Sequence, residues 1–159
     1  MCIRDRPPEA VEDIIMGCGN PEGAQGHNVG RNAAVLSNLP ITTGGTTINR
    51  YCSSGMQSIS MAASQIMAGC YDTVIAGGAE TISMMQGKQN MDNFVNERLA
   101  EKSPGIYYPM GMTAEVVAKR YNVSREAQDE YALESQMRTA AAQQSGAYDD
   151  EIIPMETKM

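Results

Sequence analysis

The sequence has few of the residues that nucleic-acid and membrane-surface binding require. Its 159 residues include only 12 lysines and arginines, against 19 aspartates and glutamates, and the formal net charge is −7. Nucleic acid and anionic membranes both attract clustered basic side chains, and the basic residues here are scattered. We therefore expect neither nucleic acid nor a membrane as a partner.

Histidine and paired cysteines are also scarce. The cysteines are Cys2, Cys18, Cys52 and Cys70, with no C-x-x-C pair among them, and His27 is the only imidazole. Zinc sites need three or four such ligands at close spacing, so we predict no metal site. The apolar segment and small-residue cleavage site of a signal peptide are missing as well. We expect a cytoplasmic location, where cysteines stay free thiols.

What is present is enough for a folded domain. Hydrophobic residues make up 42% of the sequence and charged residues 19%, and 13 residues are methionine. A chain of this length buries roughly 68–70% of the surface that it exposes when unfolded. Methionine makes a core adaptable, because its side chain is unbranched and flexible.

Alternating strand-like and helix-like segments predict an α/β fold. The expected strands are 11–16, 46–51 and 73–76, and the expected helices between them are 28–38 and 56–68. This order is typical of β-α-β units and a parallel sheet. The glycine-rich segment 17–23 follows the first strand, but its spacing is G-x-G-x-x-x-G and no helix begins directly after it. We predict a turn there rather than a dinucleotide-binding loop.

The helix at 56–68 is unusual because it lacks charge on every side. No charged residue occurs between Arg50 and Asp72, and apolar residues surround the helix axis. Such a helix is expected to be buried on all sides, in the middle of a layered structure. It is too short and too interrupted by serine and glutamine to span a membrane.

The remainder of the chain has a different character. Residues 83–112, rich in Asn, Gln, Met and Gly, predict a long excursion from the sheet. A helix is expected at 113–121, and Ser124 is predicted to cap an amphipathic surface helix that reaches about Ser145 and ends at Gly146. Residues 151–155 predict another extended segment.

Cys52 is the strongest candidate for a reactive group. It lies between a predicted strand and a predicted helix N terminus, whose partial positive charge favours a thiolate and whose N–H groups can donate to an oxyanion. A thiolate suits acyl transfer between thioesters because the thioester bond type is preserved. Packing is the alternative, since free cysteine is often buried. Cys18 in a turn and Cys70 at the helix C terminus are weaker candidates, and His27 is interpreted as a loop residue.

Several segments in order resemble the thiolases, particularly the degradative 3-ketoacyl-CoA thiolases. Residues 49–59 (NRYCSSGMQSI) resemble the acyl-enzyme cysteine segment of that family. The further matching segments are 76–83 (AGGAETIS), 109–115 (PMGMTAE), the helix beginning at Ser124, and 151–154 (EIIP). The resemblance covers roughly residues 8–157.

The resemblance implies a layered α-β-α-β-α fold with two similar halves and a loop domain inserted in the first. This chain would supply most of the first half and part of the loop domain. Residues 7–85 would be a partial core, 86–148 the partial loop domain and 149–159 the return to a core strand. Residues 1–6 resemble nothing in the family and are interpreted as an artefact or as disordered.

The resemblance also implies roles. Cys52 would carry the acyl group, and Met110 would line the substrate cleft, with core packing as the alternative for Met110. Coenzyme A and acyl-CoA would be substrates, with no bound cofactor. A homodimer or homotetramer is implied, with residues 46–51 at the dimer interface. The family's activating histidine, water-holding asparagine and second cysteine lie in the second half, and their motifs are absent from this sequence.

The function implied is acyl transfer from a 3-ketoacyl-CoA to coenzyme A, as in fatty-acid β-oxidation. Two alternatives stay open. One is a biosynthetic acetyl-CoA acetyltransferase. The other is a truncated, non-catalytic fragment that serves dimerisation or interaction.

Overall fold

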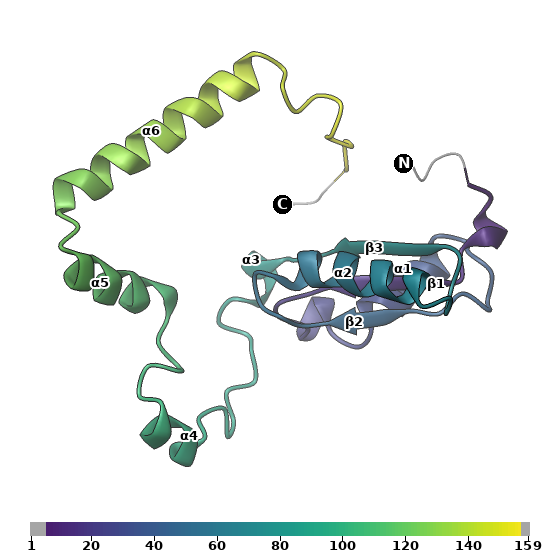
Figure 1. Cartoon of the computed structure of the whole chain (residues 1–159), viewed down its shortest axis with the longest axis horizontal. Coiled ribbons are helices and arrows are strands. Elements are labelled where there is room, and N and C mark those ends of the chain that lie inside the picture. Colours follow the sequence, from purple (N-terminus) through teal and green to yellow (C-terminus); the bar gives the residue numbers. More distant parts are fainter. Residues whose placement is uncertain (1–5, 157–159) are drawn as a thin grey trace. The chain divides into compact units, whose positions relative to one another are not determined.

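The computed structural model describes residues 6–156, and the chain forms two compact units, Met1–Asp92 and Asn93–Met159 (Figure 1). The interpretation of residues 1–6 falls, except for Arg6, outside the described residues.

A three-stranded parallel sheet forms the centre of the first unit. Its strands are β1 (Asp13–Gly17), β2 (Thr46–Ile48) and β3 (Val74–Gly78), in the order β2-β1-β3. Ile15 on the central strand pairs with Thr46 on one side and Ala76 on the other. The predicted α/β fold with a parallel sheet is confirmed.

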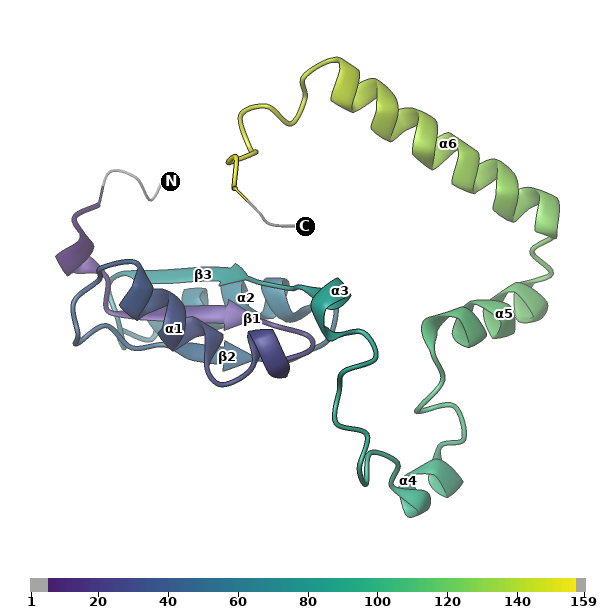
Figure 2. The same cartoon turned by 180° about the vertical axis from the view of Figure 1, so that it is seen from behind.

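Two helices cover opposite faces of this sheet. The helices are α1 (Val29–Leu36) and α2 (Ser54–Met67). α2 lies in front of the sheet in Figure 1, and α1 lies in front of it in Figure 2, the view from behind. Short 3-10 turns, η2 (Pro8–Ala10) and η3 (Gly23–Gln25), precede β1 and α1. Segment 17–23 thus leads into a turn, as predicted.

Asn28 fixes the start of α1 and joins it to the neighbouring strand. Its side-chain oxygen accepts hydrogen bonds from the Arg31 N–H at 3.1 Å and from the Thr47 hydroxyl at 2.8 Å. Its amide nitrogen donates to the Gly45 carbonyl at 2.8 Å. One side chain therefore supplies the N-cap that the orphan N–H groups of a helix need and anchors the helix on the sheet.

The first turn of α2 lies directly against β1. A Cβ atom on Gly17 would stand 2.3 Å from the carbonyl carbon of Ser54, so only glycine permits this contact. One turn further along, the fully buried Ser58 hydroxyl donates to the Gly77 carbonyl at 2.8 Å. Small residues thus set the distance between helix and sheet.

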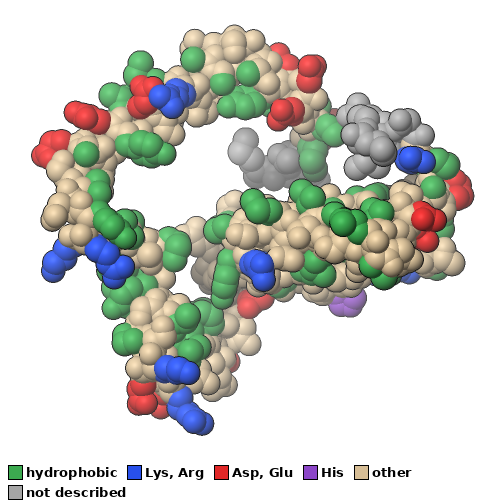
Figure 3. Space-filling model, in the orientation of Figure 1, with side chains coloured by type: hydrophobic (Ala, Val, Ile, Leu, Met, Phe, Trp, Pro, Cys, Tyr) green, Lys and Arg blue, Asp and Glu red, His purple; other side chains and the backbone are tan. Residues whose placement is uncertain are grey.

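The expectation that α2 is buried on all sides is wrong for the described chain. Ser54, Ser58 and Ala62 face the sheet and are buried, whereas Met56 is 77% exposed and Met67 is 87% exposed. Figure 3 shows hydrophobic side chains exposed on this face of the first unit. The reason is that the sheet covers only one side of the helix, and within the described residues of the first unit no second layer covers the other.

The helices after β3 are short at first and then longer. They are α3 (Ile82–Met85), which ends the first unit, then α4 (Glu97–Lys102), α5 (Met110–Tyr121) and α6 (Arg125–Gln144) in the second. The rings of Phe94 and Tyr107 pack with their centroids 5.5 Å apart, and the Tyr107 hydroxyl accepts from the Asn96 N–H at 3.1 Å. The predicted excursion after β3 is therefore a loop with small helices of its own.

The predicted limits of the longest helix are confirmed. The Ser124 hydroxyl accepts from the Ala127 N–H at 3.1 Å, and Gly146 beyond the last turn has φ +70°, as expected for a C-terminal glycine stop. The apolar side of α6 is not covered in the second unit. Leu133 is 61% exposed, Met137 is 60% exposed, and no residue of the helix is buried.

The extended segment predicted near 151–155 does not form a strand in the described residues. Ile152 and Ile153 are exposed, and the backbone there makes turn contacts instead, from the Glu151 N–H to the Tyr148 carbonyl. An extended segment becomes a strand only when it pairs with a sheet edge, and no such pairing is formed here.

Replacing Gly17 with alanine should destabilise the first unit by about 1–3 kcal/mol, because the new methyl group forces backbone against backbone. Urea unfolding of the chain measures this difference. Gly55→Ala is the matched control, since a Cβ there meets nothing within 4 Å. Equal stability of Gly17→Ala and the unchanged chain would contradict the close helix–sheet contact.

Candidate active site

Cys52 lies in a tight turn between β2 and α2. Tyr51, directly before it, adopts a left-handed backbone with φ +47°, and Ser53, directly after it, is the N-cap residue of α2. The cysteine is exposed. Non-glycine residues rarely adopt such a backbone, and those that do cluster at functional sites. The structure thus places Cys52 beside a helix N terminus, as predicted.

The hydroxyl of Ser54 holds this turn in place. It accepts from the Arg50 N–H at 2.9 Å and donates to the Tyr51 carbonyl at 2.6 Å. The Tyr51 N–H in turn donates to the side-chain oxygen of Asn49 at 2.8 Å. Strained backbone persists only where its surroundings fix it, and these three bonds do so. Sequence reasoning did not assign this role to Ser54.

No side chain caps the N terminus of α2. The first N–H groups of a helix have no partner within the helix, and together with the peptide dipoles they favour negative charge. The N–H groups of Ser53 and Ser54 already donate to the carbonyls of Arg50 and Tyr51, both at 3.0 Å, so only N–H groups further into the first turn are left to donate to a thiolate or a developing oxyanion.

A pocket of about 380 Å³ surrounds the cysteine. It is formed by the loops that follow all three strands and by the first residue of α3, and its lining residues are Gly19, Asn20, Tyr51, Cys52, Glu80 and Ile82. These loops lie at the carboxyl ends of the parallel strands, where open α/β sheets bind their ligands. The exposed Cys52 thiol, the pocket and the carboxyl ends of the strands therefore coincide in the first unit.

The carboxylate of Glu80 joins two of these loops. It accepts from the Gly19 N–H at 2.6 Å, from the side-chain amide of Gln25, and from the Cys18 thiol at 3.9 Å. Sequence reasoning missed Gln25 and Glu80 as site residues. Glu80 lies in the AGGAETIS segment that resembled a family motif, whereas Gln25 stands in a loop with no motif signal.

Cys18 is a structural thiol. It is 1% exposed, and its burial, followed by the adjacent Glu80 carboxylate, raises the pKa of the Cys18 thiol above its ordinary value. It therefore stays protonated and donates to Glu80. Cys70 is exposed beyond the C-terminal end of α2, and His27 is an exposed loop residue with φ +61°. Neither residue lines the Cys52 pocket.

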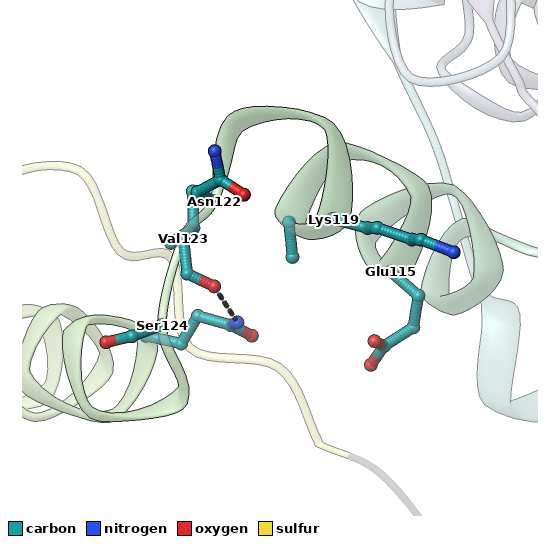
Figure 4. Close-up of a pocket in the computed structure, with 7 residues that line it drawn as sticks. Glu115, Lys119, Asn122, Val123 and Ser124 are labelled. Carbon is teal, nitrogen blue, oxygen red and sulfur yellow. Dashed lines mark hydrogen bonds between the residues drawn. The ribbon is translucent and has the colours of Figure 1, made fainter.

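Met110 is the first residue of α5 in the second unit and is 72% exposed. That it lines the substrate cleft stays a prediction. The second unit has a pocket of its own, of about 440 Å³, where α5 turns into α6 (Figure 4). Glu115, Lys119 and Ser124 are among its lining residues, and the Gln128 amide donates to the Val123 carbonyl at 3.3 Å. Its lining includes neither Met110 nor a cysteine or histidine.

Within residues 6–156, no cluster of three or more His, Cys, Asp or Glu side chains is arranged to hold a metal ion. Over the same residues, no helix has the length and apolar character that crossing a membrane requires.

Comparison with known proteins decides the family. The family described as Thiolase, N-terminal domain, matches residues 4–159. The chain belongs to the thiolase family. This thiolase chain is 51% identical over 148 residues to a 3-ketoacyl-CoA thiolase of Bacillus subtilis, a match that covers 92% of this chain and 37% of that protein.

Other relatives of this thiolase chain have a different name. An acetyl-CoA acetyltransferase of Chromobacterium violaceum is 40% identical, with 93% of this chain and 40% of that protein covered. The crystal structure of the Bacillus anthracis acetyl-CoA acetyltransferase superposes with a TM-score of 0.78 at 35% identity, covering 97% of this chain and 41% of that one. The fold is therefore thiolase-like, and the chain spans about two fifths of the length of these relatives.

Alkylation should separate the three cysteines of the described region. Cys52 and Cys70 are exposed, whereas Cys18 is buried and its raised pKa lowers its thiolate fraction at any pH below that value. Iodoacetamide at pH 8 should modify Cys52 and Cys70 and leave Cys18 unmodified, as read by peptide mass spectrometry. Unfolding in guanidinium should make all three react. Modification of native Cys18 as fast as Cys52 would show that the buried thiol is misassigned.

Proposed function

We propose that this chain supplies the acyl-carrying cysteine of a thiolase that transfers an acyl group from a 3-ketoacyl-CoA to coenzyme A, as in fatty-acid β-oxidation. The observation that supports it most is the position of Cys52, exposed in a pocket at the uncapped N terminus of α2. The family membership and the 3-ketoacyl-CoA thiolase of Bacillus subtilis support the reaction class.

The proposed chemistry has two halves. The Cys52 thiolate attacks the keto carbon of the substrate, and the carbon–carbon bond to the acetyl-CoA portion breaks. That portion leaves as an enolate and takes up a proton, while the acyl group stays on sulfur as a thioester. The thiolate of coenzyme A then attacks this thioester, releasing the shortened acyl-CoA and restoring the Cys52 thiolate. Coenzyme A and acyl-CoA are substrates, and no bound cofactor enters the proposal.

The structure suggests how the chain contributes to each half. The N–H groups at the start of α2 stabilise the thiolate before attack and the oxyanion after it. The hydroxyl of Ser54 keeps the sulfur beside them by fixing the Tyr51 turn. Activation of the thiol and protonation of the leaving enolate are general acid–base steps. We assign them to side chains outside this sequence.

Assembly and location belong to the same proposal. β2 is an edge strand of the sheet, and an edge strand presents unpaired backbone groups that suit pairing with another copy. This supports a homodimer or homotetramer with residues 46–51 at the interface. We propose a cytoplasmic location, where Cys52 stays reduced.

A biosynthetic acetyl-CoA acetyltransferase is a second candidate, favoured by the names of the Chromobacterium violaceum and Bacillus anthracis relatives. The two activities differ in substrate length. A higher kcat/KM for thiolysis of long 3-ketoacyl-CoA than of acetoacetyl-CoA supports the degradative enzyme, and the reverse supports the biosynthetic one. An interaction-only fragment is the third candidate, favoured by the exposed apolar face of α2.

Cys52→Ala should abolish acyl transfer. The 159-residue chain by itself should show no turnover, whereas a chimera completed with the remaining sequence of the Bacillus subtilis relative should be active. In that chimera, acetyl-CoA should leave an adduct of one acetyl group on Cys52, seen by peptide mass spectrometry. Cys52→Ala should lose the adduct and lower kcat by about 10³-fold or more.

Cys70→Ala is the matched control, since Cys70 is also an exposed thiol in the same unit. It should keep both the adduct and the activity. Thiolase activity that survives Cys52→Ala would falsify the assignment of the nucleophile. An inactive chimera that nevertheless dimerises would favour the interaction fragment.

Met110→Ala tests the proposed cleft residue. Because Met110 is exposed in the described unit, its truncation should change the unfolding midpoint little. If it contacts the acyl group, KM in the chimera should rise about tenfold, the scale of a few lost apolar contacts. A lower unfolding midpoint with unchanged KM would instead support the packing role. Met112→Ala, two residues further along α5, is the comparison variant.

A further inference from the structure

We propose that Gln25 and Glu80 are a pair of positioning residues that fixes the walls of the Cys52 pocket. The inference rests on the proposed function only in taking Cys52 as the nucleophile. Neither side chain is assigned a proton-transfer step.

Gln25 is the anchor of the pair. Its side chain is 4% exposed and lies in η3, in the loop after β1. Its amide nitrogen donates to the Asn20 carbonyl at 2.8 Å and to the Glu80 carboxylate, and its amide oxygen accepts from the Thr81 N–H at 2.5 Å. A buried amide needs partners for both its nitrogen and its oxygen, and this one finds them on two loops.

Glu80 extends the contact to the pocket. Its second carboxylate oxygen accepts from the Gly19 N–H at 2.6 Å, and both Glu80 and Gly19 line the pocket beside Cys52. The two carboxylate oxygens of Glu80 let it accept from Gly19 and from Gln25 at once. The pair thus joins the loop after β1 to the loop after β3.

Gly19 carries the constraint to the nucleophile turn. A Cβ on Gly19 would lie 2.9 Å from the Glu80 carboxylate and 3.3 Å from the Tyr51 carbonyl. The loop that Glu80 holds is therefore in close contact with the residue directly before Cys52. If the Gln25–Glu80 hydrogen bond is lost, the loop that contains Gly19 and Asn20 is no longer fixed against the loop after β3. We expect the Cys52 thiol then to become more accessible to reagents in solution.

A reciprocal exchange tests the pair. Gln25→Glu sets two carboxylates against each other, and Glu80→Gln removes one acceptor oxygen. In the double variant, the carboxylate at position 25 accepts from the amide at position 80 and from the Thr81 N–H, while the amide oxygen at position 80 accepts from Gly19. The double variant therefore keeps a hydrogen bond between positions 25 and 80 with donor and acceptor exchanged. It loses the hydrogen bond to the Asn20 carbonyl.

The measurement is the iodoacetamide modification rate of Cys52 relative to Cys70 in the same 159-residue chain. Cys70 is exposed and outside the pocket, so the ratio, measured at one fixed pH, cancels differences in reagent concentration. Each single variant should raise the ratio about threefold or more, and the double variant should return it toward the unchanged value. Circular dichroism checks that each variant is folded.

Three results overturn the proposal: a ratio unchanged in both single variants, a double variant no better than the singles, or variants that lower the unfolding midpoint without moving the ratio. A single variant that does not fold while the double variant does supports the pair. Failure of Cys52 to acquire an acetyl group in the unchanged chimera would count against the proposed function. The Cys52/Cys70 modification ratios would still test the Gln25–Glu80 pair independently.

Discussion

The contact between Gly17 and the first turn of α2 is the constraint on which the site depends. It brings helix backbone against strand backbone, and it sets where the helix begins relative to the end of β1. Because Cys52 lies two residues before the first residue of α2, its position follows from where that helix is held. The position of the Cys52 sulfur therefore depends on Gly17, a residue of β1 whose lack of a side chain lets α2 approach the strand.

Two sets of hydrogen bonds then fix the surroundings of Cys52, one within its turn and one between neighbouring loops. Ser54 acts within the turn and fixes the backbone of Tyr51. Gln25 and Glu80 act between loops, through Gly19. Both sets use buried or pocket-lining polar groups whose partners are mainly backbone groups. Such bonds are directional, and their loss leaves a polar group unsatisfied, so they determine geometry more sharply than apolar packing does.

Much of this arrangement could be predicted from the sequence. β-branched runs, the Ser124 cap and glycine stops indicated strands and helices, since these signals are local. Cys52 could be found because it stands at a strand–helix junction inside a recognisable segment. Gln25 could not be found, since its partners lie up to 56 residues away and nothing in its own neighbourhood distinguishes it from a surface glutamine.

The burial expected for α2 was wrong for a related reason. Periodicity reports what a helix face prefers, and whether that face is covered depends on layers beyond the three strands described.

The order of the strands has a consequence for how the first unit folds. Among the described strands the central one comes first in sequence, and Ile15 pairs with residues about 30 and about 60 positions later. Both closures are non-local, and neither forms a hairpin that nucleates alone. β1 therefore precedes both β2 and β3 in synthesis, and it can pair with β3 only after α2 has been made. The outer apolar face of that helix is exposed in the first unit, so the segment that contains Cys52 combines non-local strand pairing with exposed apolar surface, a combination that favours aggregation during folding.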